Sequence, residues 1–299
     1  MATPSQIIHL KSLSVVVGLI LLVSITMSAN PQASFNPEIW ELSWSDEFEY
    51  KGKPNPEIWD YEHGYLGFNE ELQNYTDQAE NARVEGGVLI IEAHLKDVTA
   101  QRSKEIRKEL KGSNAKVDRL GSQEFTSARL ITRGKKEFVH ARVESRARFT
   151  TGRGTWPAIW LLGDESKQPW PLCGEMDIME HVGFKPNHVY SAVHSKISNF
   201  MNGAGISQEV ILEDVWGDFH TYAVEWDANA IRYFIDDVCY HVIEKGNRPK
   251  DDWPFVSDNP FYLILNIAVG GSWGGKEGID KTLFPQRMEV DYVRVFKRK

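Results

Sequence analysis

The stretch GEMDIMEH, Gly174–His181, places three carboxylates among apolar residues in a segment that otherwise has the composition of a buried strand. Burying charge costs free energy, so acids in such a strand need a reason. On a regular strand, side chains two positions apart share a face. Glu175 and Asp177 would therefore point together, while Glu180 would point to the opposite face.

A β-bulge near Ile178 and Met179 removes this conflict. A bulge inserts one extra residue into a strand, which returns Glu180 to the face of the other two acids. Glu175 and Glu180 then lie an effective four steps apart, roughly 13 Å along an ideal strand, and twist and side-chain lean must bring their carboxyls closer. We expect all three acids on one face. The alternatives are an exposed acidic strand and a cation site.

Carboxylates paired in this way suit the cleavage of glycosidic bonds. One acts as nucleophile and the other as acid, so their pKa values must differ, and a third acid can adjust the nucleophile's charge. Retaining enzymes hold the pair about 5–5.5 Å apart and inverting enzymes about 6.5–9.5 Å, a difference that the sequence leaves open. Tryptophans in GTWPAIWLLG (Gly154–Gly163) and at Trp170 favour a carbohydrate cleft, where sugar rings rest on flat aromatic faces.

Strands dominate the rest of the chain. Short segments rich in β-branched and aromatic residues, with turn residues between them, occur at 88–95, 127–133, 140–149, 189–197, 220–227, 230–236, 261–269 and 288–296. No amphipathic helix pattern separates them. The chain is therefore predicted to be all-β, a two-sheet β-sandwich or jelly roll, with one domain from about Asn36 to Lys299.

Charge and composition restrict the partners. The 299 residues carry a formal net charge of −8, whereas a nucleic-acid-binding protein needs a basic face to meet phosphates. Ten tryptophans supply flat surfaces that can line a binding cleft. An uncharged partner fits better than a nucleic acid.

The N-terminus has the pattern of a secretory leader. Lys11 precedes the apolar run Leu13–Met27, which is followed by small residues. The run is shorter than the roughly 20 residues of a spanning helix. We expect a signal peptide over residues 1–29 and a secreted or periplasmic protein, with an uncleaved membrane anchor as the alternative.

Three further features are predicted to be structural. Cys173 and Cys239 permit one disulfide, but two unpaired buried thiols are favoured because a chain this long builds a core without a crosslink. The stretch Gly270–Gly278 resembles a phosphate loop but has Glu277 where Ser or Thr is needed. The charged stretch Gln101–Lys116 is expected to be a solvated insertion.

Taken together, the motifs resemble glycoside hydrolase family 16, and most of all its laminarinase-type endo-β-1,3-glucanases. The resemblance rests on WPLCGEMDIMEH (Trp170–His181), GTWPAIWLLG, ELQNYT (Glu71–Thr76), LNIAVGGSWGG (Leu265–Gly275) and FPQRMEVDYVRVF (Phe284–Phe296). The matches extend from about Leu42 to the C-terminus in the family's order. The resemblance implies a β-jelly roll with a concave substrate groove, and double-displacement hydrolysis with retention.

The resemblance also implies roles for residues. Glu175 matches the nucleophile, Asp177 the acid that assists it, and Glu180 the acid/base. The extra residue Met179 is typical of laminarinases, whereas lichenase-type relatives lack it. The residues implied in substrate binding are Trp156, Trp160, Asn69, Arg129, His194 and Trp273.

A structural calcium ion is a further implication, with no cofactor needed for catalysis. Many family members bind it on the convex face through an aspartate and backbone carbonyls, ligands that suit a hard cation. Asp291 matches the aspartate, and Glu47 and Gly87 the carbonyl donors. The alternative for Asp291 is a strand-edge hydrogen bond. Glu70 and Asn74 depart from the residues common in laminarinases, so linkage preference is less constrained than reaction type.

From this resemblance we expect a monomeric, secreted endo-glycosidase whose partner is a β-glucan, with no nucleic acid and no membrane for the mature domain. Enzymes of the same fold that cut mixed-linkage glucan or marine galactan are alternatives, as is a transglycosylase. A non-catalytic glucan-recognition protein is the alternative from another class. Such proteins typically lose the glutamates, and this sequence retains both.

Overall fold

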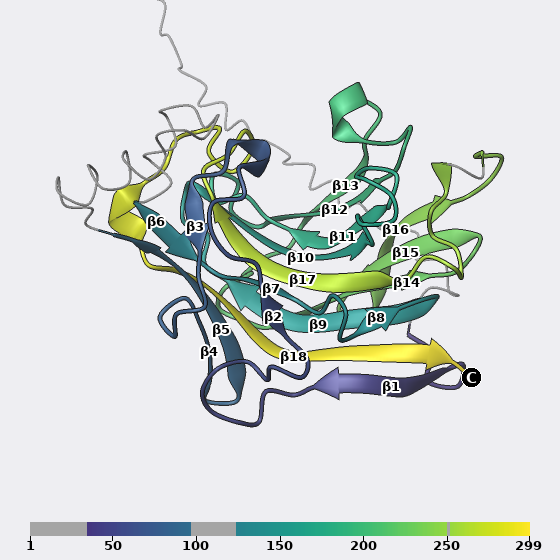
Figure 1. Cartoon of the computed structure of the whole chain (residues 1–299), viewed down its shortest axis with the longest axis horizontal. Helices are drawn as coiled ribbons and strands as arrows, with labels where there is room; N and C mark the ends of the chain where they lie inside the picture. Colours follow the sequence, from purple (N-terminus) through teal and green to yellow (C-terminus); the bar gives the residue numbers. More distant parts are fainter. Residues whose placement is uncertain (1–34, 97–123, 250–251) are drawn as a thin grey trace, which may run out of the picture.

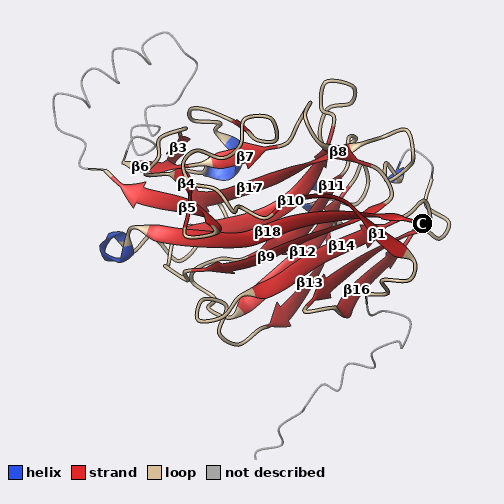
Figure 2. Cartoon of the chain, turned by 90° about the horizontal axis from the view of Figure 1, so that it is seen from below, coloured by secondary structure: helices blue, strands red, loops and turns tan. Residues whose placement is uncertain are grey.

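The computed structural model describes residues 35–96, 124–249 and 252–299. They form two curved sheets that pack face to face (Figures 1 and 2). The described helical elements are 3-10 turns, namely η1 (Phe68–Glu70), η3 (Phe200–Asn202) and η5 (Lys281–Leu283). The predicted all-β sandwich is confirmed. The leader and the charged stretch Gln101–Lys116 lie outside the described residues.

The larger sheet has ten strands and contains the C-terminal strand. Its order is β16 (Val238–Glu244), β15 (Ala230–Ile235), β14 (His220–Trp226), β9 (Ala141–Phe149), β18 (Gln286–Arg298), β5 (Val88–Leu95), β6 (Phe125–Ser127) and β3 (Gln73–Tyr75). Two more strands complete it. β1 (Trp40–Asp46) pairs with β18, and β4 (Ala82–Glu85) pairs with β5.

The smaller sheet has eight strands and contains the acidic motif. Its order is β13 (Ile206–Ile211), β12 (His188–His194), β11 (Glu175–Glu180), β10 (Thr155–Gly163), β17 (Phe261–Val269), β7 (Arg129–Ile131) and β2 (Asp60–Tyr61), with β8 (Glu137–Phe138) also on β17. The acidic strand β11 is therefore an interior strand, held by neighbours on both edges.

Strand alternation divides the smaller sheet into a core face and a cleft face. In β17, Leu265 and Ile267 belong to the hydrophobic core between the sheets, while Asn266 and Ala268 line a cleft. The same period of two operates along β10 and β7. One face of this sheet thus stabilises the sandwich, and the other is free to carry chemistry.

The predicted strands agree with the structure at several places, but other strands were missed, among them β1, β10, β13 and β16. The segments predicted at 88–95 and 261–269 coincide with β5 and β17. No strand was predicted over β10, which contains Pro157, a residue with no N–H for a ladder. The Pro157 carbonyl accepts from His181 N, just beyond the end of β11. In a strand, the N–H and C=O of one residue point to the same neighbouring strand. The N–H that Pro157 lacks would therefore point toward β11, at the position where the β10–β11 ladder ends.

The two cysteines are both free thiols, Cys173 buried and Cys239 only partly buried. The expectation of unpaired thiols is confirmed, although the expectation that both are buried holds for Cys173 alone. Across the described residues, no helix has the length and apolar character needed to cross a membrane.

Candidate active site

The predicted bulge lies in the middle of β11. Asp177 pairs with Ala192 of β12, but Glu180 pairs with Tyr190, so residues 178–179 share a single opposing residue. The ladder to β10 shifts register at the same point. The bulge prediction is confirmed, and it brings the third acid back into phase with the first two.

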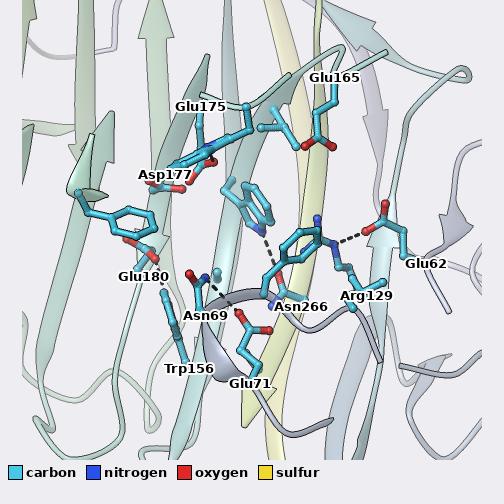
Figure 3. Close-up of a pocket in the computed structure, with 18 of the residues that line it drawn as sticks. Glu62, Asn69, Glu71, Arg129, Trp156, Glu165, Glu175, Asp177, Glu180 and Asn266 are labelled. Carbon is cyan, nitrogen blue, oxygen red and sulfur yellow. Dashed lines mark hydrogen bonds and ion pairs between the residues drawn. The ribbon is translucent and has the colours of Figure 1, made fainter. Parts of the chain in front are cut away.

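Figure 3 shows the three acids in one cleft of about 440 Å³. Glu175, Asp177 and Glu180 line it, whereas the bulged Ile178 and Met179 are fully buried in the core on the opposite face. The strand therefore directs its acidic side chains into the cleft and its apolar side chains into the core. The expectation that all three acids face one side is confirmed.

Glu175 is held by a tryptophan. The Trp170 indole N–H donates to Glu175 Oε2 at 2.6 Å. Burial raises the pKa of Glu175 to about 8, with the neighbouring charge of Asp177 as the second cause, and the Trp170 hydrogen bond opposes both. Trp170 therefore stabilises the ionised form in a setting that otherwise favours the neutral carboxyl.

Asp177 and His194 lie directly beside Glu175. His194 Nε2 is 3.4 Å from Asp177 Oδ2 and 3.8 Å from Glu175 Oε1. Burial raises the pKa of Asp177 to about 7, so the two carboxyls share a proton near neutral pH. His194 was predicted to bind substrate. The structure places it against the acids, and it is not among the residues that line the cleft.

Glu180 has a different environment. The Trp156 indole N–H donates to Glu180 Oε1 at 2.9 Å. Burial, followed by the charge of Asp177, raises the pKa of Glu180 well above its ordinary value. The raised pKa favours the protonated form of Glu180, the form required of a general acid. Trp156, predicted as a sugar platform, also fixes the direction of this carboxyl.

The remaining predicted binding residues occupy two positions relative to the cleft. Trp160, Asn69 and Arg129 line it, as expected. The Arg129 guanidinium lies 4.7 Å over the Trp160 ring and forms an ion pair with Glu62 at 2.5 Å (Figure 3). Trp273 does not line the cleft. Its ring packs edge-on against Trp156 at 5.0 Å, so it supports the tryptophan that holds Glu180.

Several cleft residues were not predicted as site residues. Trp170 was noted only as a flanking aromatic. Asn266 interrupts an otherwise apolar strand, a signal of function, and it accepts the Trp160 indole N–H at 2.8 Å. Glu71 is nearly buried, and burial raises its pKa. Phe200 and Met201 also line the cleft, and no sequence pattern pointed to them.

The residues expected to bind calcium belong to the ten-stranded sheet and its loops, whereas the three acids belong to the eight-stranded sheet. β5 pairs with β18 as far as Val290, and β1 pairs with it from Val293, so both strands flank Asp291. Glu47 follows the end of β1, and Gly87 precedes β5. The topology thus gathers the three positions at one break in the sheet edge.

The side chains at this break are engaged with arginines. Asp291 Oδ2 accepts from Arg146 at 2.7 Å, and Glu47 accepts from Arg294 at 2.8 and 3.0 Å. The expected calcium ligands of Glu47 and Gly87 are backbone carbonyl oxygens. The ion pair of Glu47 uses its side-chain carboxylate, so it does not occupy the backbone oxygen. Calcium binding there stays a prediction.

Comparison with known proteins identifies relatives along most of the chain. A family model described as glycosyl hydrolases family 16 matches residues 96–294. A beta-glucanase from Rhodothermus marinus is 45% identical over 287 residues, 93% of this chain and 92% of that protein. A glucan endo-1,3-beta-glucosidase from Cryptopygus antarcticus is 33% identical, over 85% of this chain and 91% of that protein. The X-ray structure of the laminarinase from Rhodothermus marinus matches with a TM-score of 0.76 at 45% identity, covering 87% of this chain and 98% of that one.

Proposed function

The chain belongs to glycosyl hydrolases family 16 and is a glycoside hydrolase, and from this premise we propose that it cleaves internal β-1,3-glucosidic bonds of laminarin-like glucans with retention of configuration. The observation that carries the proposal is the bulge that places Glu175, Asp177 and Glu180 on one cleft wall. The names of the relatives, a beta-glucanase, a laminarinase and a glucan endo-1,3-beta-glucosidase, support the linkage.

The first step forms a covalent intermediate. A Glu175 oxygen attacks the anomeric carbon while Glu180 gives its proton to the leaving glycosidic oxygen. The raised pKa of Glu180 favours the protonated form that supplies this proton, and the Trp156 N–H directs the carboxyl. Bond cleavage releases one half of the glucan and leaves the other half as an ester of Glu175.

The second step releases the product. Glu180, now ionised, takes a proton from water, and the water oxygen attacks the anomeric carbon. The Glu175–carbon bond breaks, and Glu175 leaves as a carboxylate. Two inversions at the same carbon give a product with the configuration of the substrate.

Asp177 adjusts the charge of the nucleophile. Glu175 and Asp177 share one proton near neutral pH, and the reactive form has it on Asp177, so that Glu175 is the anion. The Trp170 N–H stabilises this arrangement because it donates to Glu175. His194, next to both carboxyls, keeps Asp177 in place.

The charges of the cleft support a neutral substrate over a sulfated galactan. Outside the catalytic trio, the described cleft-lining residues include the acids Glu62, Glu71 and Glu165. The one basic residue among them, Arg129, is paired with Glu62. A sulfated chain would find no unpaired basic side chain among the described cleft-lining residues to meet its sulfates.

Secretion, a monomeric state and a structural calcium ion complete the proposal. Secretion is supported by the apolar run Leu13–Met27. Calcium is supported by the convergence of Glu47, Gly87 and Asp291 at the break between β1 and β5. There the ion would stabilise the sheet edge by ligating oxygen atoms, without taking part in catalysis.

The test uses the purified chain without residues 1–29. We expect internal cleavage of laminarin, measured by product sizing, slower cleavage of mixed-linkage glucan and none of sulfated galactan. Proton NMR of the first products should show the β-anomer before mutarotation. An α-anomer would contradict retention, and the absence of product from laminarin would contradict the proposed substrate.

A further inference from the structure

A short turn beside the cleft presents apolar side chains to solvent. Phe200 and Met201 in η3 are 55% and 68% exposed, and both line the cleft. In Figure 1, η3 rises beyond the ends of β12 and β13. Apolar side chains exposed next to an active site are unfavourable in the free protein and become favourable once a ligand covers them.

The turn is built to hold these side chains in place. The buried Asn199 accepts from the N–H groups of Met201 and Asn202, and its amide donates to the carbonyl of Ser195 at 2.9 Å. Asp252, 2% exposed, accepts from Ser195 Oγ and from Ile197 N, both at 2.7 Å. Two buried polar side chains therefore fix the turn, and the exposure of its apolar residues is part of the folded structure.

Phe200 also contacts the residues that hold the acids. Its ring lies 5.4 Å from the ring of Trp170, which donates to Glu175, and 5.5 Å from the ring of His194, which touches Asp177. The apolar surface of η3 is thus continuous with the catalytic centre.

The two ends of the cleft differ in chemistry. On one side of β11, beyond β10, the cleft is lined by Arg129 and Asn266, which are 6% and 5% exposed. On the other side, η3 follows β12 and supplies Phe200 and Met201. Beside β17, the cleft combines these buried polar groups with the exposed Phe68 of η1 (Phe68–Glu70), whereas the η3 end presents Phe200 and Met201.

We propose that Phe200 and Met201 form the platform for the first sugar on the leaving-group side of the scissile bond. This inference rests on the proposed function. In double displacement, the glycone stays bound through both steps, whereas the leaving sugar must depart before water attacks. Buried hydrogen-bonding groups suit the retained half, and an open apolar surface that stacks a sugar ring suits the half that is exchanged.

A consequence concerns the fate of the covalent intermediate. A second glucan that binds the platform places its 3-hydroxyl at the anomeric carbon. The hydroxyl oxygen attacks, its proton passes to Glu180, and Glu175 departs as a carboxylate. The platform therefore sets how often the intermediate is transferred to a sugar instead of to water.

The experiment traps the intermediate and follows its release. 2-Deoxy-2-fluoro-β-laminaribiosyl fluoride should ester-link to Glu175 with loss of fluoride, as located by peptide mass spectrometry. Reactivation is then measured in buffer alone and with laminaribiose as acceptor. In the wild type, laminaribiose should accelerate reactivation. We define the acceptor ratio as the reactivation rate with laminaribiose divided by the rate in buffer alone. This ratio should fall about 10-fold in Phe200→Ala and about threefold in Met201→Ala.

Phe68→Ala is the matched control, because Phe68 is 56% exposed and lines the same cleft from η1. Its acceptor ratio should equal that of the wild type, and Phe200→Tyr should restore the ratio lost in Phe200→Ala. Since the ratio compares two fates of one intermediate, a general loss of activity does not change it. Should Phe200→Ala fail to fold, Met201→Ala decides.

Two results would overturn the inference. The first is a wild-type reactivation rate that laminaribiose does not increase, and the second is an acceptor ratio that is unchanged from wild type in both Phe200→Ala and Met201→Ala. Failure of the proposed function looks different, because no adduct would then form on Glu175 of the wild type.

Discussion

Trp170 donates its indole N–H to Glu175 Oε2 across 2.6 Å. The bond connects the loop between β10 and β11 to the first acid of the motif. It opposes the rise in pKa that burial imposes on Glu175. The ionisation of Glu175 thus depends on the balance between that bond, the neighbouring acid and burial.

Replacing Trp170 by Phe should lower kcat/KM on laminarin about 10- to 100-fold, because a hydrogen bond to a charged group contributes about 1.5–3 kcal/mol. Without the N–H, the pKa of Glu175 rises further, so the acid limb of the pH–rate profile should move to higher pH. Trp160→Phe is the control, since its indole donates to Asn266 and not to an acid. An unmoved acid limb in Trp170→Phe would remove this role.

Replacing Glu175 or Glu180 by Ala should abolish turnover of laminarin while circular dichroism shows an intact fold. Azide distinguishes the roles when an activated aryl β-laminaribioside is the substrate. In Glu175→Ala, azide replaces the nucleophile and should give the α-glycosyl azide. In Glu180→Ala, azide attacks the covalent intermediate and should give the β-azide. The reverse pattern of anomers would exchange the two assignments.

Asp177→Asn should move the acid limb of kcat/KM to lower pH. The charge of Asp177 raises the pKa of Glu175, and its removal lets Glu175 ionise more readily. We expect kcat to fall on the order of 100-fold all the same, because the amide cannot hold the shared proton. A kcat/KM profile from pH 4 to pH 10 measures both effects, and a rise of the acid limb would contradict the assigned cause.

Glu175→Gln should stabilise the fold more at high pH than at low pH. The folded pKa of about 8 lies above the ordinary 4.5, so the stability that the carboxyl contributes is complete below pH 4.5 and is lost as the pH rises through 8. The neutral amide avoids this loss. The difference in unfolding free energy between variant and wild type should therefore grow by about 1 kcal/mol or more from pH 5 to pH 9. Urea denaturation measures it, and an equal difference at both pH values would refute the shift.

Calcium should raise the melting temperature by several degrees, and EDTA should reverse the effect. Asp291→Ala should remove the response to calcium. A 1 kcal/mol change at the midpoint corresponds to about 2–4 °C in a domain of this size. Because Asp291 also pairs with Arg146, the melting temperature of Arg146→Ala with and without calcium separates the ion pair from the metal. If calcium leaves the wild-type melting temperature unchanged, the proposed site is wrong.

The sequence was informative where a local pattern has one physical solution. Strands β5 and β17 are recognisable because a short continuous run of β-branched and aromatic residues is typical of a buried strand. The bulge was predictable because the three acids needed a common face, and a regular strand cannot give one to positions 175, 177 and 180. The family motifs supplied the roles of Glu175, Asp177 and Glu180, and the site geometry is consistent with them.

Other features depended on contacts that no local pattern shows. Pro157 lies in an interior strand, and the end of the neighbouring ladder that accommodates it is visible only once β11 is in place. His194 was expected to bind substrate. The register of β12 places it opposite Glu175 and on the same face of the sheet, but its ring lies against the two acids. Phe200 lies far along the chain from Trp170, with β11 and β12 between them, and the short turn η3 that carries Phe200 has no amphipathic period.

The bulge also makes β11 tolerant of one particular change in length. Deleting Met179 would leave the acids at alternate positions of a regular strand, all still facing the cleft, at the cost of one buried methionine side chain. Deleting Met176 would instead turn Glu175 out of step with the other two acids. A one-residue deletion at the bulge therefore keeps the three acids on one face, whereas a one-residue deletion between Glu175 and Asp177 does not.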